Sequence, residues 1–185
     1  DDNDAAVLYA ESLMDLKPWQ LWTSEGKRQE GTPEILSVLE TVLARDPNHP
    51  GANHYYIHAI EASPTPEKGA QSAERLRTLV PGAGHLVHMP AHIYIRTGNY
   101  NGAIDANANG ARADEAYFAR TKVDGMYPLM YYVHNFQFLA TAAGMVGRFK
   151  EATDAAAKAV SQATPLAGQD PMAEYVLPWS MYAMV

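Results

Sequence analysis

Apolar residues recur every three or four positions along most of this chain, with polar residues between them. The stretches that show this spacing are residues 4–16, 33–46, 71–80, 101–120 and 150–160. Such spacing places the apolar side chains on one face of an α-helix, and the abundance of alanine favours a helix as well. Two aromatic-rich segments, HYYIHAI at 54–60 and MYYVHNF at 130–136, have the spacing and flanks of a buried helix. The pattern therefore predicts an all-α protein.

Clusters of proline, glycine and asparagine separate these helical stretches. They lie at residues 46–51, 64–66, 81–84 and 97–99. Proline ends or restarts a helix because it lacks a backbone N–H, and glycine readily takes the left-handed conformation that closes one. Helices joined by such short turns pack against each other as antiparallel pairs. We therefore expect stacked helical hairpins in a single domain over residues 1–185.

An internal repeat of 34 residues fixes the register of these hairpins. The shift maps three residues onto counterparts one period later: Pro47 onto Pro81, His54 onto His88, and His58 onto His92. A 34-residue helix-turn-helix period is typical of tetratricopeptide repeats. The turn GNYNGAI at 98–104 resembles the Gly-x-Tyr-x-x-Ala-Ile turn of that family, and GRFKEA at 147–152 repeats it.

The chain is thus similar to the tetratricopeptide family over roughly residues 4–163. The resemblance implies a right-handed superhelix of about four hairpins, near residues 4–47, 50–81, 84–117 and 133–163, with insertions near 16–32 and 118–127. Residues 49–63 and 81–96 also resemble a group of long bacterial tetratricopeptide-like proteins, which implies a fold but no activity. From its first and last residues, we expect the chain to be a segment of a longer protein.

In tetratricopeptide domains the first helix of each hairpin lines a concave groove, where ligands bind. The resemblance implies that six of the seven histidines face this groove, and that His49, in a turn, does not. The inward positions that carry ionisable groups are His54, His58, Glu61, His85, His88, His92 and His134.

Histidines four residues apart lie on one face of a helix, so His54 with His58, and His88 with His92, form two pairs of ligands. Helices that pack about 8 to 10 Å apart let the two pairs converge on one ion. Imidazole suits Zn²⁺ best here, and also Cu, Ni or Fe ions. We therefore predict a divalent transition-metal site. The residues expected to complete or tune it are Glu61, His85, His134 and, from the first hairpin, Glu11.

Several alternatives stay open at this point. Six histidines exceed the needs of one tetrahedral ion, so the groove either holds two ions or uses some histidines as supporting or substrate-binding groups. The segment HYYIH lacks the glutamate of zinc proteases, and no other residue identifies a catalytic base. If the protein is an enzyme, metal-activated water is the simplest mechanism. The runner-up is a non-catalytic scaffold that binds a peptide or protein partner in the groove, and a third alternative is metal storage.

Composition and charge argue against some classes of binding partner. The net charge is −7 and the 14 Lys and Arg residues are scattered, which argues against nucleic acid. No apolar run approaches the roughly 20 residues of a membrane-spanning helix, so we expect a soluble protein and no membrane partner. Cysteine is absent, which excludes thiolate ligands and leaves the compartment open. The oligomeric state also stays open.

Five further features carry expectations. Pro90 should interrupt its helix and swing His85 relative to the histidines that follow. Trp19 and Trp22, in the first insertion, either cover the groove or pack at the edge of the core. Arg96 faces the groove in this register, where it meets a substrate anion or neutralises an acid. Residues 107–116 are expected to form an ordinary exposed helix. Tyr55 and Tyr94 are possible hydrogen-bond partners of the histidines.

Overall fold

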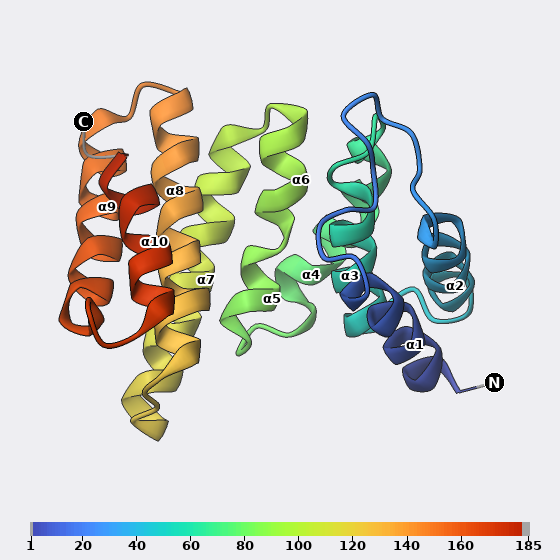
Figure 1. Cartoon of the computed structure of the whole chain (residues 1–185), viewed down its shortest axis with the longest axis horizontal. Coiled ribbons are helices and arrows are strands. Elements are labelled where there is room, and N and C mark those ends of the chain that lie inside the picture. The colour runs from blue at the N-terminus through green and yellow to red at the C-terminus, as the bar shows by residue number, and fades with distance from the viewer. Residues whose placement is uncertain (1, 183–185) are drawn as a thin grey trace.

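A computed structural model describes residues 2–182 of the chain, and they fold almost entirely as helices (Figure 1). The α-helices are α1 (Asn3–Asp15), α2 (Thr32–Arg45), α3 (Pro50–Ile60), α4 (Ala70–Leu79), α5 (Gly84–His88), α6 (Pro90–Thr97), α7 (Tyr100–Thr121), α8 (Val133–Met145), α9 (Phe149–Ala163) and α10 (Pro171–Tyr182). Shorter elements are the 3₁₀ helices η1 (Pro66–Gly69) and η3 (Thr164–Leu166) and the π-helix η2 (Pro128–Tyr132). The only β pairing within residues 2–182 is an isolated bridge between Trp22 and Arg28, so the predicted all-α class is confirmed.

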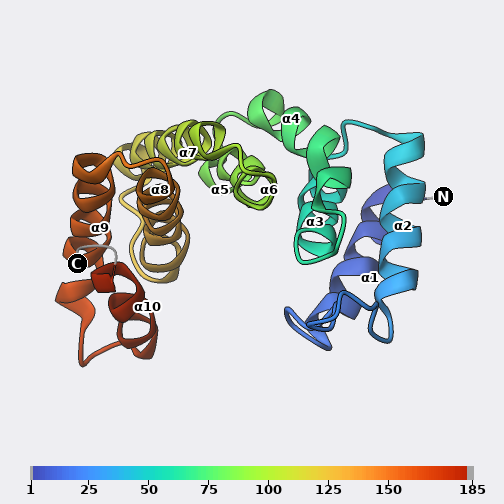
Figure 2. The same cartoon turned by 90° about the horizontal axis from the view of Figure 1, so that it is seen from above.

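Successive helices pack as pairs along an arch. α1 packs with α2, α3 with α4, α5 and α6 with α7, and α8 with α9. Figure 2 shows that α1, α3, α6 and α8 lie on the concave side of this arch, whereas α2, α4, α7 and α9 lie on its outer side. The first helix of each pair therefore faces the concave side, which is the arrangement of a helical repeat fold.

The predicted breaks coincide with the observed helix ends. His49 caps α3 by accepting a hydrogen bond from the amide of Ala52 (3.2 Å), and Pro50 occupies the first helical position. Gly98, in the left-handed conformation at φ +81°, ends α6, and the Asn99 side chain then caps α7 through the amide of Gly102 (3.1 Å). Local sequence signals thus set where the helices begin and end.

Small side chains let these helices approach closely. Many fully buried positions are alanines, and the larger core residues, such as Ile35, Leu39, Ile57 and Ile93, fill the space between the pairs. α5 and α7 approach closely, since a Cβ atom on Gly84 would come within 2.6 Å of the backbone oxygen of Gly110. Among the described residues, no helix combines the length and the apolar character needed to cross a lipid bilayer.

Parts of the C-terminal half and of the first insertion differ from the sequence-based expectations. The predicted helix over 130–136 is present, but its first turn is the π-helix η2. α10 was not predicted, and it packs against α9. In the first insertion, Trp22 is half-buried at the edge of the core and donates a hydrogen bond to the carbonyl of Ala59 (2.8 Å), whereas Trp19 is 90% exposed. Of the two roles expected of these tryptophans, packing at the core edge describes Trp22.

The expected helix at 107–116 is present as part of α7, but the expectation that it is exposed is wrong for one of its faces. In α7 the side chains of Asn107 and Asp114 are fully or almost fully buried, together with Gly110 and Ala111. An alanine- and glycine-rich helix packs so closely against its neighbours that its polar residues on the same face are enclosed. These two polar side chains make contacts that support the histidine cluster described below.

Candidate metal centre

Six of the seven histidines lie together where α3, α5, α6 and α8 meet. His54 and His58 come from α3, His85 and His88 from α5, His92 from α6, and His134 from α8. Their rings touch in succession: for example, the centroids of His58 and His92 lie 4.8 Å apart, and so do those of His88 and His134. His49 lies outside the cluster, where it caps α3 and contacts Asp4 (3.0 Å).

The six histidines form two groups of three, and a third possible ligand set, His58, Glu61 and His92, takes one histidine from each group. His88, His92 and His134 form one group, which we call the buried triad, and His54, His58 and His85 form the other, which we call the outer triad. In each triad one nitrogen from every ring lies within 4.8 Å of the other two. The four histidines that the sequence pairs on one ion, His54, His58, His88 and His92, are therefore divided between the triads.

The buried triad contains the most enclosed rings of the cluster. His88 is fully buried and His92 is 6% exposed. Their Nε2 atoms face each other at 2.9 Å, while their Nδ1 atoms contact oxygens of Asn107 (2.6 Å) and Glu61 (2.7 Å), respectively. Phe138 packs against all three rings of the triad and gives it an apolar wall.

These contacts fix which nitrogens carry protons. The Asn107 amide group donates to the carbonyl of Ala103 (2.7 Å), so its oxygen is the atom that accepts a hydrogen bond from Nδ1 of His88. Nδ1 of His92 faces the Glu61 carboxylate, which only accepts, so this nitrogen also carries a proton. In the neutral rings both Nε2 atoms then bear lone pairs, and these lone pairs point toward each other.

The outer triad is less enclosed, and all three of its rings are half-buried. Nε2 of His54 and Nε2 of His85 lie 3.2 Å apart, and Nδ1 of His58 contacts Glu61 at 2.9 Å. Tyr55 packs against the ring of His54 and Tyr131 against that of His85, both with centroids 4.6 Å apart. Nδ1 of His85 is buried and has no hydrogen-bond partner among the described residues.

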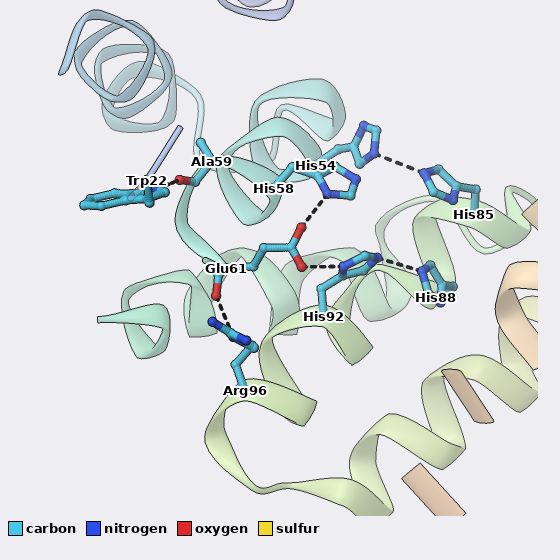
Figure 3. Close-up of polar contacts among 9 residues, drawn as sticks. All are labelled: Trp22, His54, His58, Ala59, Glu61, His85, His88, His92 and Arg96. Carbon is cyan, nitrogen blue, oxygen red and sulfur yellow. Dashed lines mark hydrogen bonds and ion pairs between the residues drawn. The ribbon is translucent and has the colours of Figure 1, made fainter. Parts of the chain in front are cut away.

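Glu61 connects the two triads. Figure 3 shows its carboxylate between them, with one oxygen on His58 and the other on His92. Burial alone would raise the pKa of this carboxyl group, but the attraction and hydrogen bonds of His92 and His58 outweigh burial and lower it. Glu61 is therefore an anion. Its two oxygens accept hydrogen bonds from the Nδ1–H groups of His58 and His92, one ring from each triad. In metal sites, carboxylates in this position orient the histidine ligands.

Burial keeps most of the cluster neutral. Burial, reinforced by neighbouring histidines, lowers the pKa of His54 to about 2 and the pKa values of His85 and His134 to about 3. The pKa of His88 is lowered well below its usual value for the same reasons. Burial also lowers the pKa of His92, although Glu61 opposes the shift. Neutral imidazole is the form that binds metal ions, so these rings are ready to act as ligands at neutral pH.

Two features of the backbone position the rings on α5 and α6. The predicted interruption at Pro90 is observed, since α5 ends at His88 and α6 begins at Pro90. The interruption leaves His85 facing His54 across the concave side, whereas His92 faces His88. At the start of α5, the buried Asp114 carboxylate packs against Gly84 and accepts hydrogen bonds from Tyr127 and Asn135, both at 2.8 Å.

The remaining candidates lie beside the cluster rather than within it. Arg96 is exposed, and its Nε atom donates to the backbone carbonyl of Glu61 (2.9 Å) rather than to a groove acid (Figure 3). Glu11 is hydrogen-bonded to Tyr55 and belongs to neither triad. The hydroxyl of Tyr94 donates to Glu74 on α4, not to a histidine.

Sequence reasoning missed two supporting residues, Asn107 and Phe138. Asn107 lies on the buried face of α7, and its only sequence signal is a polar residue at helical spacing among alanines and glycines. Phe138 follows His134 by one turn of α8, so it lies on the same face of that helix.

Comparison with known proteins bears on the fold and not on the site. No protein-family model matches the chain, and no curated protein matches its sequence. Among solved structures, the chain is similar to the crystal structure of MamA, a tetratricopeptide-repeat protein, with a TM-score of 0.55 and 14% sequence identity. The match covers 83% of this chain and 88% of that chain. The likeness supports a tetratricopeptide-like helical repeat fold, and at this identity it concerns the fold alone.

Proposed function

We propose that this protein binds a divalent transition-metal ion, preferentially Zn²⁺, at the buried triad on the concave side of its helical repeat. The observation that carries the proposal is the pair of Nε2 atoms of His88 and His92, which face each other at 2.9 Å while both Nδ1 atoms donate to oxygens. Two lone pairs at this distance repel each other unless a cation lies between them. A metal ion can accept both lone pairs at once, and neutral imidazole is the form that binds it.

The dimensions and chemistry of the triad also suit such an ion. Ligand nitrogens about 2.0 to 2.1 Å from a tetrahedral ion lie roughly 3.3 Å from one another, so the two Nε2 atoms, 2.9 Å apart, would move apart by only a few tenths of an ångström to bind it. His134 offers a third nitrogen within 4.8 Å of both. Three imidazoles favour Zn, Cu, Ni or Fe ions over Mg²⁺ or Ca²⁺. The polar contacts at Asn107 and Glu61 hold two of the rings in the orientation that a ligand needs.

Three protein ligands leave the fourth position of a tetrahedral ion for water or another small ligand. Structural zinc sites usually fill all four positions with protein groups, whereas catalytic sites keep one open. The proposed site is therefore of the open kind. A water molecule bound there would have a pKa lowered toward neutrality, which is the chemistry that a metal would supply to a bound substrate.

Metal content tests the proposal directly. The full chain is purified without a nickel column, dialysed against buffered Zn²⁺, and analysed by elemental mass spectrometry. We expect at least one ion per chain in the wild type and a loss of metal in the His88→Ala/His92→Ala variant. The matched control is His49→Asn, which removes the histidine outside the cluster while keeping a side chain that caps α3.

Circular dichroism establishes that each variant is folded. Because both alanine substitutions are buried, His134→Ala, at a half-buried position on a different helix, serves as a second variant. Less than one ion in folded wild type, or equal metal in wild type and variants, would overturn the proposal. A folded protein without metal would instead favour the scaffold alternative, in which the concave side of the repeat binds a peptide or protein partner.

A further inference from the structure

We propose that the cluster holds a second divalent transition-metal ion, bound by His54, His58 and His85 of the outer triad; this inference rests on the proposed function of the buried triad. The three rings come from two helices, α3 and α5, and the rings of His54 and His85 meet with their centroids 5.0 Å apart. One nitrogen of each ring lies within 4.8 Å of the other two.

The outer triad shares two features with the buried triad. Nε2 of His54 and Nε2 of His85 face each other at 3.2 Å, close to the roughly 3.3 Å separation of nitrogens around a tetrahedral ion. Nδ1 of His58 is occupied by the Glu61 carboxylate, so its Nε2 atom is the nitrogen that remains for a ligand bond. Each triad therefore has two facing Nε2 atoms and at least one ring whose Nδ1 atom is held by an oxygen.

One ion cannot use all six histidines. A Zn²⁺ ion takes four ligands in most protein sites, and each triad already offers three. Glu61 contacts both sets, because one of its oxygens accepts a hydrogen bond from Nδ1 of His58 and the other from Nδ1 of His92. One carboxylate thereby orients a ligand of each ion, which gives the two sites a shared supporting residue (Figure 3).

The two sites differ in affinity, and the outer ion is the weaker and more exchangeable one. In the buried triad, Asn107 and Glu61 hold two rings in place, whereas in the outer triad only His58 has such a partner. The outer rings are half-buried and more accessible to water and to chelators. Electrostatic repulsion also lowers the affinity for the second ion, because two divalent ions face the single carboxylate of Glu61 and repel each other.

The inference is tested by titration of the full chain after removal of metal with a chelator. Zn²⁺ is added in competition with a chromophoric chelator, which gives the number of sites and each affinity. Co²⁺ is titrated in parallel, because its visible absorption reports tetrahedral coordination. We expect two ions per wild-type chain with affinities that differ by at least tenfold. His85→Ala should retain one ion at the tighter affinity, and His134→Ala should lose the tighter binding event.

Controls separate the second site from the first. His54→Ala changes the outer triad from a different helix and should give the same result as His85→Ala, which guards against a folding defect in either variant. His49→Asn should keep both ions. One ion in the wild type that His85→Ala retains would overturn the second site and leave the proposed function standing. Loss of both ions in His85→Ala would overturn separate binding, and no ion in the wild type would overturn both proposals.

Discussion

Acidification should destabilise the metal-free protein through its histidines. Burial lowers the pKa values of His54, His85 and His134 to about 2 to 3, so these rings stay neutral in the folded state at pH 5.5. In the unfolded chain a histidine has a pKa near 6.5 and is about nine-tenths protonated at that pH. The unfolded state therefore binds more protons, and stability falls as the pH drops below about 6.5.

The size of this loss of stability follows from the same pKa shifts. When the unfolded state binds one proton more than the folded state, the free energy of unfolding falls by about 1.4 kcal/mol for each pH unit of acidification. Between pH 7.5 and 5.5, each of the three histidines should lower the free energy of unfolding by about 1.4 kcal/mol, or about 4 kcal/mol together. His88 and His92, whose pKa values are also lowered, act in the same direction. Glu61 has a lowered pKa, so the stability that it contributes is lost only at more acidic pH, near the pKa of an unfolded glutamate. A loss of this size is a large part of the roughly 5 to 15 kcal/mol that stabilises a typical domain.

The assay is urea unfolding of the chelator-treated protein at pH 7.5, 6.5 and 5.5, followed by circular dichroism. The His85→Asn/His134→Asn variant removes two of the titrating groups and should lose about 2.7 kcal/mol less than the wild type over this range. The His49→Asn control lacks only the histidine outside the cluster and should follow the wild type. Wild-type stability that does not change with pH, or equal losses in wild type and double variant, would refute a buried, neutral histidine cluster.

Three further substitutions test supporting contacts. Glu61→Gln keeps the shape of the side chain but leaves one histidine without an acceptor, so Zn²⁺ affinity should fall about 10- to 100-fold in a chelator competition; complete loss would make Glu61 a direct ligand. Gly84→Ala should cost about 1 to 3 kcal/mol in urea unfolding because its methyl group would meet α7, whereas Gly82→Ala, with open space around it, should cost little. Trp22→Phe removes a hydrogen bond to the backbone of α3 and should lower stability by about 1 kcal/mol in the same assay.

Most of the fold could be predicted because the signals that set it are local. Apolar spacing marks the helices, and the caps at His49 and Asn99 with the turn glycine Gly98 mark their ends. The repeat then orders the helices into pairs. η2 and α10 were missed because neither belongs to the repeat: η2 follows an insertion, and α10 lies beyond the last predicted hairpin.

The repeat register also indicated that six histidines lie on one side of the repeat, and their rings are in contact, but the register did not predict how they group. Periodicity gives the face of a helix on which a residue lies, and His88 and His92 share that face. Grouping depends on distances between helices, which the interruption at Pro90 and the position of α8 determine. His85 is directed to His54 on one side of that interruption, and His134 reaches His88 from a helix that follows a non-repeating insertion. The spacing of residues within one helix gives no information on these distances between helices.

The polar support of the cluster was missed for a physical reason that applies beyond this chain. α7 is rich in alanine, glycine and polar residues, a composition that suggests solvent exposure. Small side chains instead permit close packing, and at Gly84 and Gly110 the two helices approach so closely that Asn107 reaches Nδ1 of His88. An isolated Asn or Asp one helical turn from buried alanines and glycines is therefore better read as an enclosed hydrogen-bonding group. In this protein, that reading would have identified both Asn107 and Asp114 as supports for the histidine-bearing helix α5.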